Sequence, residues 1–103
     1  MKEAKFFIGQ IIFHKRFHYR GVVIDVDSEF SGTEEWYEQM AQSHPPKDEP
    51  WYHVLVHDSD HETYVAEQNM IAESEPAPIT HPLVDTFFSQ FNNGHYLHND
   101  ISN

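Results

Sequence analysis

The chain has 103 residues, 39% of them hydrophobic and 22% charged, and its formal net charge is −11. This length predicts a single domain, residues 1–103, with one modest core, and no run of about 18 apolar residues that would span a membrane is present. The sequence has no cysteine, which excludes disulfides, thiolate chemistry and cysteine-ligated zinc. Residues 1–5 also lack the apolar stretch of a secretory signal, so we expect a cytoplasmic location.

The charge is distributed unevenly along the chain. Residues 1–20 carry a net charge of +4, whereas residues 21–103 carry Lys47 against sixteen acidic residues, a net charge of −15. This acidity favours solubility and repels the phosphate backbone of a nucleic acid. It argues against a general DNA-binding protein. Two interpretations stay open: acidity that serves only solubility, and an acidic face that contacts a basic partner.

Two β-strands are predicted near the N-terminus. Residues 9–15 form a β-branched and aromatic run between Gly9 and a basic turn at residues 16–20. Residues 21–26 form the second strand, in which alternate residues face opposite sides. Two such strands around a short turn, each starting with glycine, are typical of the opening hairpin of a small SH3-like barrel.

A long insertion loop is predicted over residues 28–50. The spacing Ser31-Gly32-Thr33-Glu34 is that of a capping box, and residues 35–40 continue it as one or two helical turns. Residues 44–50 contain three prolines and cannot continue the helix or form a central strand. A connection of this length in a compact domain is usually functional or mobile.

A second hairpin is predicted from residues 51–57 and 62–66, with a polar turn at residues 58–61 between them. After a turn at Glu67 and Gln68, residues 69–72 are expected to form a short closing strand. A linker over residues 73–78 follows it.

A C-terminal helix is predicted at residues 82–91. Pro82 lies near its first position, Asp85 lies in its first turn, and apolar residues follow at helical spacing until Asn92-Asn93-Gly94 ends it. The polar tail, residues 97–103, is expected to fray. The predicted core consists of alternate strand residues, with two phenylalanines covering one end: Val22, Ile24, Val26, Tyr52, Val54, Val56, Phe87 and Phe91.

Four sequence blocks resemble a known family: IGQIIFH (8–14), RGVVIDVD (20–27), PWYHVLV (50–56) and YVAEQN (64–69). In this order, from about residue 5 to residue 96, the chain resembles the HspQ/YccV family of small bacterial heat-shock proteins, also catalogued as hemimethylated-DNA-binding proteins. The resemblance implies a mainly β fold: a small, bent antiparallel SH3-like barrel with a loop-helix insertion and a C-terminal helix. It also implies a non-enzymatic accessory factor that promotes degradation of denatured proteins by an ATP-dependent protease of the Lon type. The alternative is a protein that binds hemimethylated DNA.

Four apolar residues of the insertion are the candidate protein-contact residues: Phe30, Trp36, Tyr37 and Met40. A small barrel does not need them for its own core, and exposed aromatic residues are favoured at protein interfaces. The other interpretation is that the insertion folds back and covers an open end of the barrel.

Four basic residues are the candidate DNA-contact residues under the alternative function: Lys15, Arg16, His18 and Arg20. They alternate with aromatic residues, as a surface that contacts phosphates and stacks on bases would. Three or four phosphate contacts would give weak binding that depends strongly on salt. The other interpretation is a basic turn without a nucleic-acid partner.

No catalytic or metal-binding motif is found in the sequence. The imidazoles of His57 and His61, on either side of a tight turn, are of a ligand type that suits zinc or nickel. Their spacing matches no established ligand pattern, so a solvated turn is the preferred interpretation. Asp25 and Asp27 lie at i and i+2, as a glycosidase pair could, but acids at strand ends are usually solvated. We expect no catalysis, no cofactor and no bound metal. The oligomeric state, a homo-oligomer included, is left open.

Overall fold

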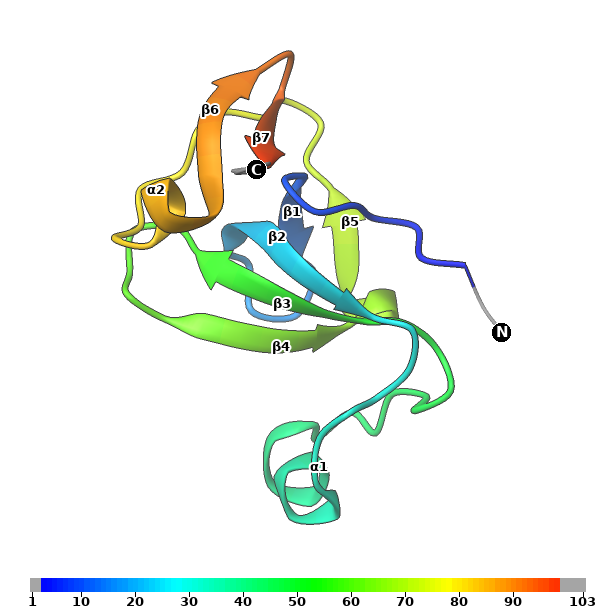
Figure 1. Cartoon of the computed structure of the whole chain (residues 1–103). Coiled ribbons are helices and arrows are strands. Elements are labelled where there is room, and N and C mark those ends of the chain that lie inside the picture. The colour runs from blue at the N-terminus through cyan, green and yellow to red at the C-terminus, as the bar shows by residue number, and fades with distance from the viewer. Residues whose placement is uncertain (1–2, 99–103) are drawn as a thin grey trace, which may run out of the picture.

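The computed structural model describes residues 3–98, which form seven β-strands and short helices (Figure 1). Five strands make one antiparallel sheet in the order β4-β3-β2-β1-β5, and two make a separate hairpin. The strands are β1 (Ile11–His14), β2 (Arg20–Asp27), β3 (Trp51–Val56), β4 (Glu62–Ala66), β5 (Met70–Ala72), β6 (Phe88–Asn92) and β7 (His95–His98). The helices are α1 (Glu34–Met40), a 3₁₀ turn (Glu67–Asn69) and α2 (Val84–Phe87). None of these helices is long and apolar enough to cross a membrane.

The mainly β, antiparallel fold is confirmed, and the strands predicted up to residue 72 differ from the observed ones only by a residue or two at their ends. Within residues 3–98, β4 pairs only with β3 and β5 only with β1, so no ladder joins the two edge strands. A closed SH3-like barrel therefore stays a prediction.

The core consists of three clusters rather than one. A hairpin-side cluster joins the sheet to the C-terminal hairpin: Ile11, Val22, Ile24, Leu55, Ile79, Phe88 and Tyr96. A sheet cluster fills the other face of the central strands: Ile12, Val23, Tyr52, Val54, Val65 and Met70. An insertion-side cluster packs against the start of β3: Tyr37, Ala41, Trp51 and Ala66.

A β-bulge in β2 explains where the predicted core differs from the observed one. The register between β2 and β3 shifts between Val23 and Asp25, which leaves Ile24 without a partner. Val22 belongs to the hairpin-side cluster and Val23 to the sheet cluster, so both are fully buried because both faces of β2 are covered there. The bulge that follows places Val26 against the sheet cluster rather than on the face of Val22 and Ile24. Of the predicted core, Val26 and Val56 are only half-buried.

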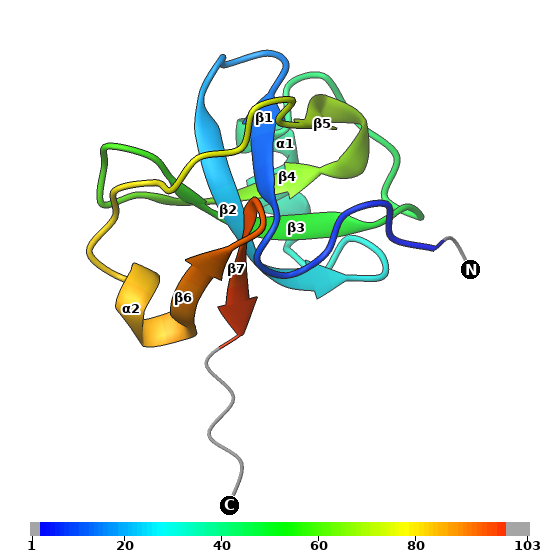
Figure 2. The same cartoon turned by 90° about the horizontal axis from the view of Figure 1, so that it is seen from above.

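The predicted C-terminal helix is wrong over most of its length, because only residues 84–87 are helical and β6 and β7 follow as a hairpin. Asn93 and Gly94 connect these strands with φ angles of 54° and 84°. Positive φ at both central residues is the geometry of a type I′ turn, for which Asn-Gly is the preferred sequence. The hairpin lies over one end of the sheet, with α1 at the other (Figures 1 and 2).

This hairpin changes the outcome for three predicted features. Phe88, which is buried, replaces Phe87 and Phe91 as the main cover of the hairpin-side cluster, and these two residues pack half-buried at its margin. Leu97 and His98 belong to β7, so the fraying predicted from residue 97 is wrong for these two residues. Residues 99–103 of the predicted tail lie outside the described part of the chain.

The insertion folds back onto the sheet. Thr33 rather than Ser31 caps α1, since its hydroxyl accepts a 3.1 Å hydrogen bond from the backbone N–H of Trp36. The indole N–H of Trp51 donates a 3.0 Å hydrogen bond to the carbonyl oxygen of Pro46, which fixes the proline segment against β3. The insertion therefore covers one end of the sheet as an ordered layer.

Candidate functional site

An apolar groove lies between α1 and the basic turn, residues 15–20, that joins β1 to β2. Two adjoining cavities of about 300 and 410 Å³ share Phe17 from the turn, and Trp36 and Met40 from α1. Both are also lined by Tyr64 and Val65 of β4. Because β4 is an edge strand, the groove lies beside a sheet edge whose outer backbone groups have no strand partner within residues 3–98.

The rims of the groove are unusually exposed. Phe17 is 67% and Met40 is 62% exposed, the highest values among the large hydrophobic residues of the described chain. Isolated exposed hydrophobic residues need no explanation, but two of them on opposite rims of one cavity are typical of a binding surface.

The four predicted protein-contact residues fall in three different environments. Trp36 and Met40 line the groove, and their role as protein contacts stays a prediction. Phe30 lies half-buried beneath them, with its ring centroid 4.9 Å from that of Trp51. Tyr37 is only 7% exposed, so its prediction as a surface contact is wrong: the small core recruits it into the insertion-side cluster.

The predicted DNA-contact residues are also divided. Arg16 lines the groove, with its guanidinium carbon 5.8 Å from the centroid of the Phe17 ring. Lys15 is exposed, and His18 has a φ of 57° and stacks on Phe13. The guanidinium of Arg20 donates a 3.0 Å hydrogen bond to the carbonyl oxygen of Ala77, so this cation fixes the linker. The basic turn therefore places one cation in the groove.

His14 fixes the shape of the basic turn. It is 4% exposed, and its Nδ1 accepts hydrogen bonds of 3.1 Å from the backbone N–H groups of Arg16 and Phe17. Burial and, to a smaller extent, the positive charges of Arg16 and His18 together lower the pKa of His14 to about 4. A neutral imidazole thus holds the turn that presents Phe17. Sequence reasoning missed this role, although the position of a histidine directly before a turn is a usable signal.

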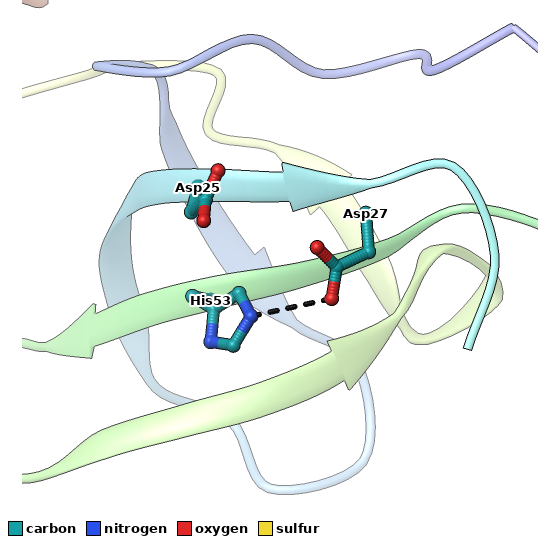
Figure 3. A group of neighbouring side chains, drawn as sticks. All are labelled: Asp25, Asp27 and His53. Atoms are coloured by element: carbon teal, nitrogen blue, oxygen red, sulfur yellow. Dashed lines mark hydrogen bonds and ion pairs between the residues drawn. The ribbon is translucent and has the colours of Figure 1, made fainter. Parts of the chain in front are cut away.

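A polar group adjoins the groove at the middle of the sheet (Figure 3). The bulge places Asp25 opposite His53, and Asp27 lies two residues further along the same strand. The possible ligand atoms of these three residues lie within 4.8 Å of one another. Asp27 and His53 also line a third cavity, of about 470 Å³, which shares Trp36 and Tyr64 with the groove. These residues could hold a metal ion.

The orientation of this polar group is determined by its neighbours. The hydroxyl of Tyr64 donates a 2.6 Å hydrogen bond to Oδ2 of Asp27 and accepts one of 2.9 Å from the backbone N–H of Ser31. Burial, together with the bond to Asp27, raises the pKa of the Tyr64 hydroxyl well above its usual value. The hydroxyl therefore remains a donor, and the Asp27 carboxylate keeps its position.

The histidine turn between β3 and β4 serves the fold. Nδ1 of His57 accepts a 2.8 Å hydrogen bond from the backbone N–H of Thr80, and His61 is exposed. Similarly, Nδ1 of His81 accepts a 3.0 Å bond from the backbone N–H of Leu83. The His57 bond attaches the segment before α2 to the end of β3, and the His81 bond fixes the backbone at the start of α2.

A comparison with known families agrees with the sequence resemblance. The family model described as hemimethylated DNA-binding protein YccV like matches residues 4–95. This range includes the whole five-stranded sheet, both rims of the groove and most of the C-terminal hairpin. The chain belongs to the YccV-like family.

Proposed function

We propose that this protein is a non-enzymatic heat-shock accessory factor of the cytoplasm, which promotes degradation of certain denatured proteins by an ATP-dependent, Lon-type protease. The observation that carries the proposal is the apolar groove with Phe17 and Met40 exposed on its opposite rims. Denatured proteins expose extended apolar segments, and a groove beside an open sheet edge suits such segments. Membership of the YccV-like family supports this proposal, because the chain resembles the heat-shock proteins of the HspQ/YccV family.

The charge of the chain also favours a protein partner. The formal net charge is −11, and Glu62 and Asp27 lie on the borders of the groove cavities. These carboxylates repel phosphates, whereas they attract the lysines and arginines of a polypeptide. We therefore infer that apolar contacts supply the affinity and the acidic border disfavours nucleic acids.

The second candidate function is binding of hemimethylated DNA, which the family description names. The observation that favours it is the basic turn, where Lys15 and Arg16 directly precede Phe17, whose aromatic ring is exposed. Such a ring can stack on a base while the cations contact phosphates. Against it, Arg20 is bound to the linker, so few phosphate contacts remain.

A degradation assay with purified protease and a denatured substrate tests the first function. We expect the double variant Phe17→Ser with Met40→Ser to lose stimulation, with an apparent affinity lower by roughly 30-fold, as for one binding hot spot. Ile71→Thr is the matched control, because Ile71 is 46% exposed and lies outside the groove. Full stimulation by the double variant, or an equal loss in the control, would contradict the proposal.

The two functions are separated by residues that belong to only one site. Arg16 and Phe17 cannot separate them, since the structure places both beside Trp36 in one groove. Met40→Ser should impair only the protease assay, and Lys15→Gln should impair only DNA binding, because Lys15 does not line the groove. DNA binding is measured by titration of hemimethylated and fully methylated duplexes over a range of salt. The second function would be favoured if Lys15→Gln bound DNA more weakly, with the slope of log affinity against log salt concentration reduced by roughly one unit, while Met40→Ser stimulated the protease normally.

A further inference from the structure

We propose that Asp25, Asp27 and His53 bind one divalent transition-metal ion, for which Zn²⁺ is the best fit. An imidazole nitrogen with two carboxylate oxygens is a common ligand set for Zn²⁺ and related ions. The absence of a metal-binding motif from the sequence predicted no bound metal, whereas the fold brings these three residues together. This inference does not depend on the proposed role in proteolysis.

The spacing of the polar atoms agrees with metal coordination. Nε2 of His53 lies 3.4 Å from Oδ2 of Asp27, which is longer than a usual hydrogen bond between nitrogen and oxygen. Two ligands of a tetrahedral ion with bonds of about 2.1 Å are separated by about 3.4 Å. Asp25 is exposed, and a carboxylate oxygen of it lies within 4.8 Å of the other two ligand atoms. A small rotation of the Asp25 side chain brings that oxygen to coordination distance, and water completes the shell.

The surrounding residues orient the ligands as the second shell of a metal site does. Nδ1 of His53, the ring nitrogen opposite the proposed metal, lies 3.4 Å from Oε2 of Glu62. A carboxylate at this position favours the tautomer that carries its proton on Nδ1 and leaves the lone pair of Nε2 available to a metal. The Tyr64 hydroxyl donates a 2.6 Å hydrogen bond to Oδ2 of Asp27, the same oxygen that faces His53, and so fixes its position.

The local charge also favours a cation. Asp25, Asp27 and Glu62 place three carboxylates around one imidazole, and within residues 3–98 none of them has an ion pair with a lysine or arginine. Like charges at this separation raise the free energy of the site, and a divalent ion removes that repulsion. The third cavity, which Asp27 and His53 line, gives the ion access from solvent.

Titration of Zn²⁺ into chelator-stripped, tag-free protein by calorimetry tests the proposal. We expect one Zn²⁺ per chain, with Asp27→Asn and His53→Gln binding at least tenfold more weakly. Glu62→Gln should also weaken binding, by roughly tenfold, which is the size of effect typical of a second-shell partner. Zinc should shift the imidazole NMR signals of His53 in the intact protein.

Two further variants make each result interpretable. Asp60→Asn with His61→Gln changes the same residue types in the exposed turn, and we expect it to bind Zn²⁺ as the natural chain does. Asp25→Asn alters an exposed residue, so it remains informative if another variant fails to fold. The proposal is overturned if Zn²⁺ does not bind stoichiometrically, if Asp25→Asn and His53→Gln bind it normally, or if only the turn variant loses binding.

Discussion

The hydroxyl of Tyr37 donates a 2.7 Å hydrogen bond to the carbonyl oxygen of Pro45. This bond connects α1 to the proline segment that returns the chain to β3, and the Tyr37 ring packs edge-on against Phe30 at 5.4 Å. The two halves of the insertion thus share one buried tyrosine. The helix that carries Trp36 and Met40 to the groove rim is anchored to the core through Tyr37 on its other face.

The first prediction concerns this tyrosine. Tyr37→Phe removes the hydroxyl that donates a hydrogen bond to the Pro45 carbonyl oxygen. We therefore expect the free energy of unfolding to fall by about 1 kcal/mol. Tyr37→Ala should cost about 3 kcal/mol or more, because it also removes the ring from a buried position. Urea denaturation measures both. Met40→Ala on the same helix is the control, and a loss in it equal to that of Tyr37→Ala would contradict the assignment.

The second prediction concerns the sheet cluster. Val54 is fully buried at the centre of β3, so Val54→Ala should destabilise the domain by roughly 2 kcal/mol or more. Ile71→Ala, at a residue that is 46% exposed, should cost much less. Equal losses of unfolding free energy in the two variants, measured by denaturant melts, would contradict the assignment of Val54 to the buried face of β3.

The third prediction concerns the Asn93-Gly94 turn. Gly94 has a φ of 84°, and an added Cβ would lie 3.0 Å from Cγ of Pro76. Gly94→Ala should therefore destabilise the protein by about 1 to 2 kcal/mol, whereas Asn93→Gly should have a small effect. Thermal unfolding compares the two variants. Equal stability of Gly94→Ala and the natural chain would exclude the type I′ turn.

The fourth prediction is a pH dependence from His14. Its pKa is lowered from 6.5 to about 4 by burial and by the charges of Arg16 and His18, so the unfolded chain binds a proton that the folded chain does not. The resulting stability is complete above about pH 6.5 and is lost as the pH falls towards 4, by up to about 3 kcal/mol.

His14→Phe isolates this contribution. The variant keeps an aromatic ring but cannot accept the hydrogen bonds from Arg16 and Phe17. We expect it to be less stable than the natural chain at pH 7.5 and nearly equal at pH 4. Urea melts at several pH values test this, and the difference between the two proteins removes the contribution of other titrating groups. A difference that stays constant with pH would show that His14 does not titrate in this way.

Strand positions were predictable because alternation and turn residues are local signals. The C-terminal hairpin was not recognised because Phe87, Phe88 and Phe91 also have helical spacing, and Asn93-Gly94 can end a helix or form a hairpin turn. The choice between a helix and a hairpin depends on how this segment covers the apolar face of the sheet, which is a contact between segments distant in sequence. Neither the spacing of the phenylalanines nor the turn sequence was therefore sufficient to identify the hairpin.

The candidate sites depended on contacts between segments distant in sequence. Trp36 and Met40 were identified from composition, but the approach of Phe17 to them depends on how the basic turn lies beside β4. Asp25 and His53 are paired only because a bulge shifts the register by one residue, and no local pattern indicated that bulge. The unpaired Ile24 thus brings Asp25 opposite His53, which makes this acidic residue a candidate metal ligand.

The hairpin-side cluster has a consequence for biosynthesis. Its sheet residues, Ile11, Val22, Ile24 and Leu55, are translated before Phe88 and Tyr96, which belong to the hairpin β6-β7. The nascent sheet therefore carries an uncovered apolar surface until the hairpin has been translated, and such surfaces promote aggregation. Fragments that lack the hairpin would keep this surface exposed and aggregate, whereas chains that include the hairpin cover it.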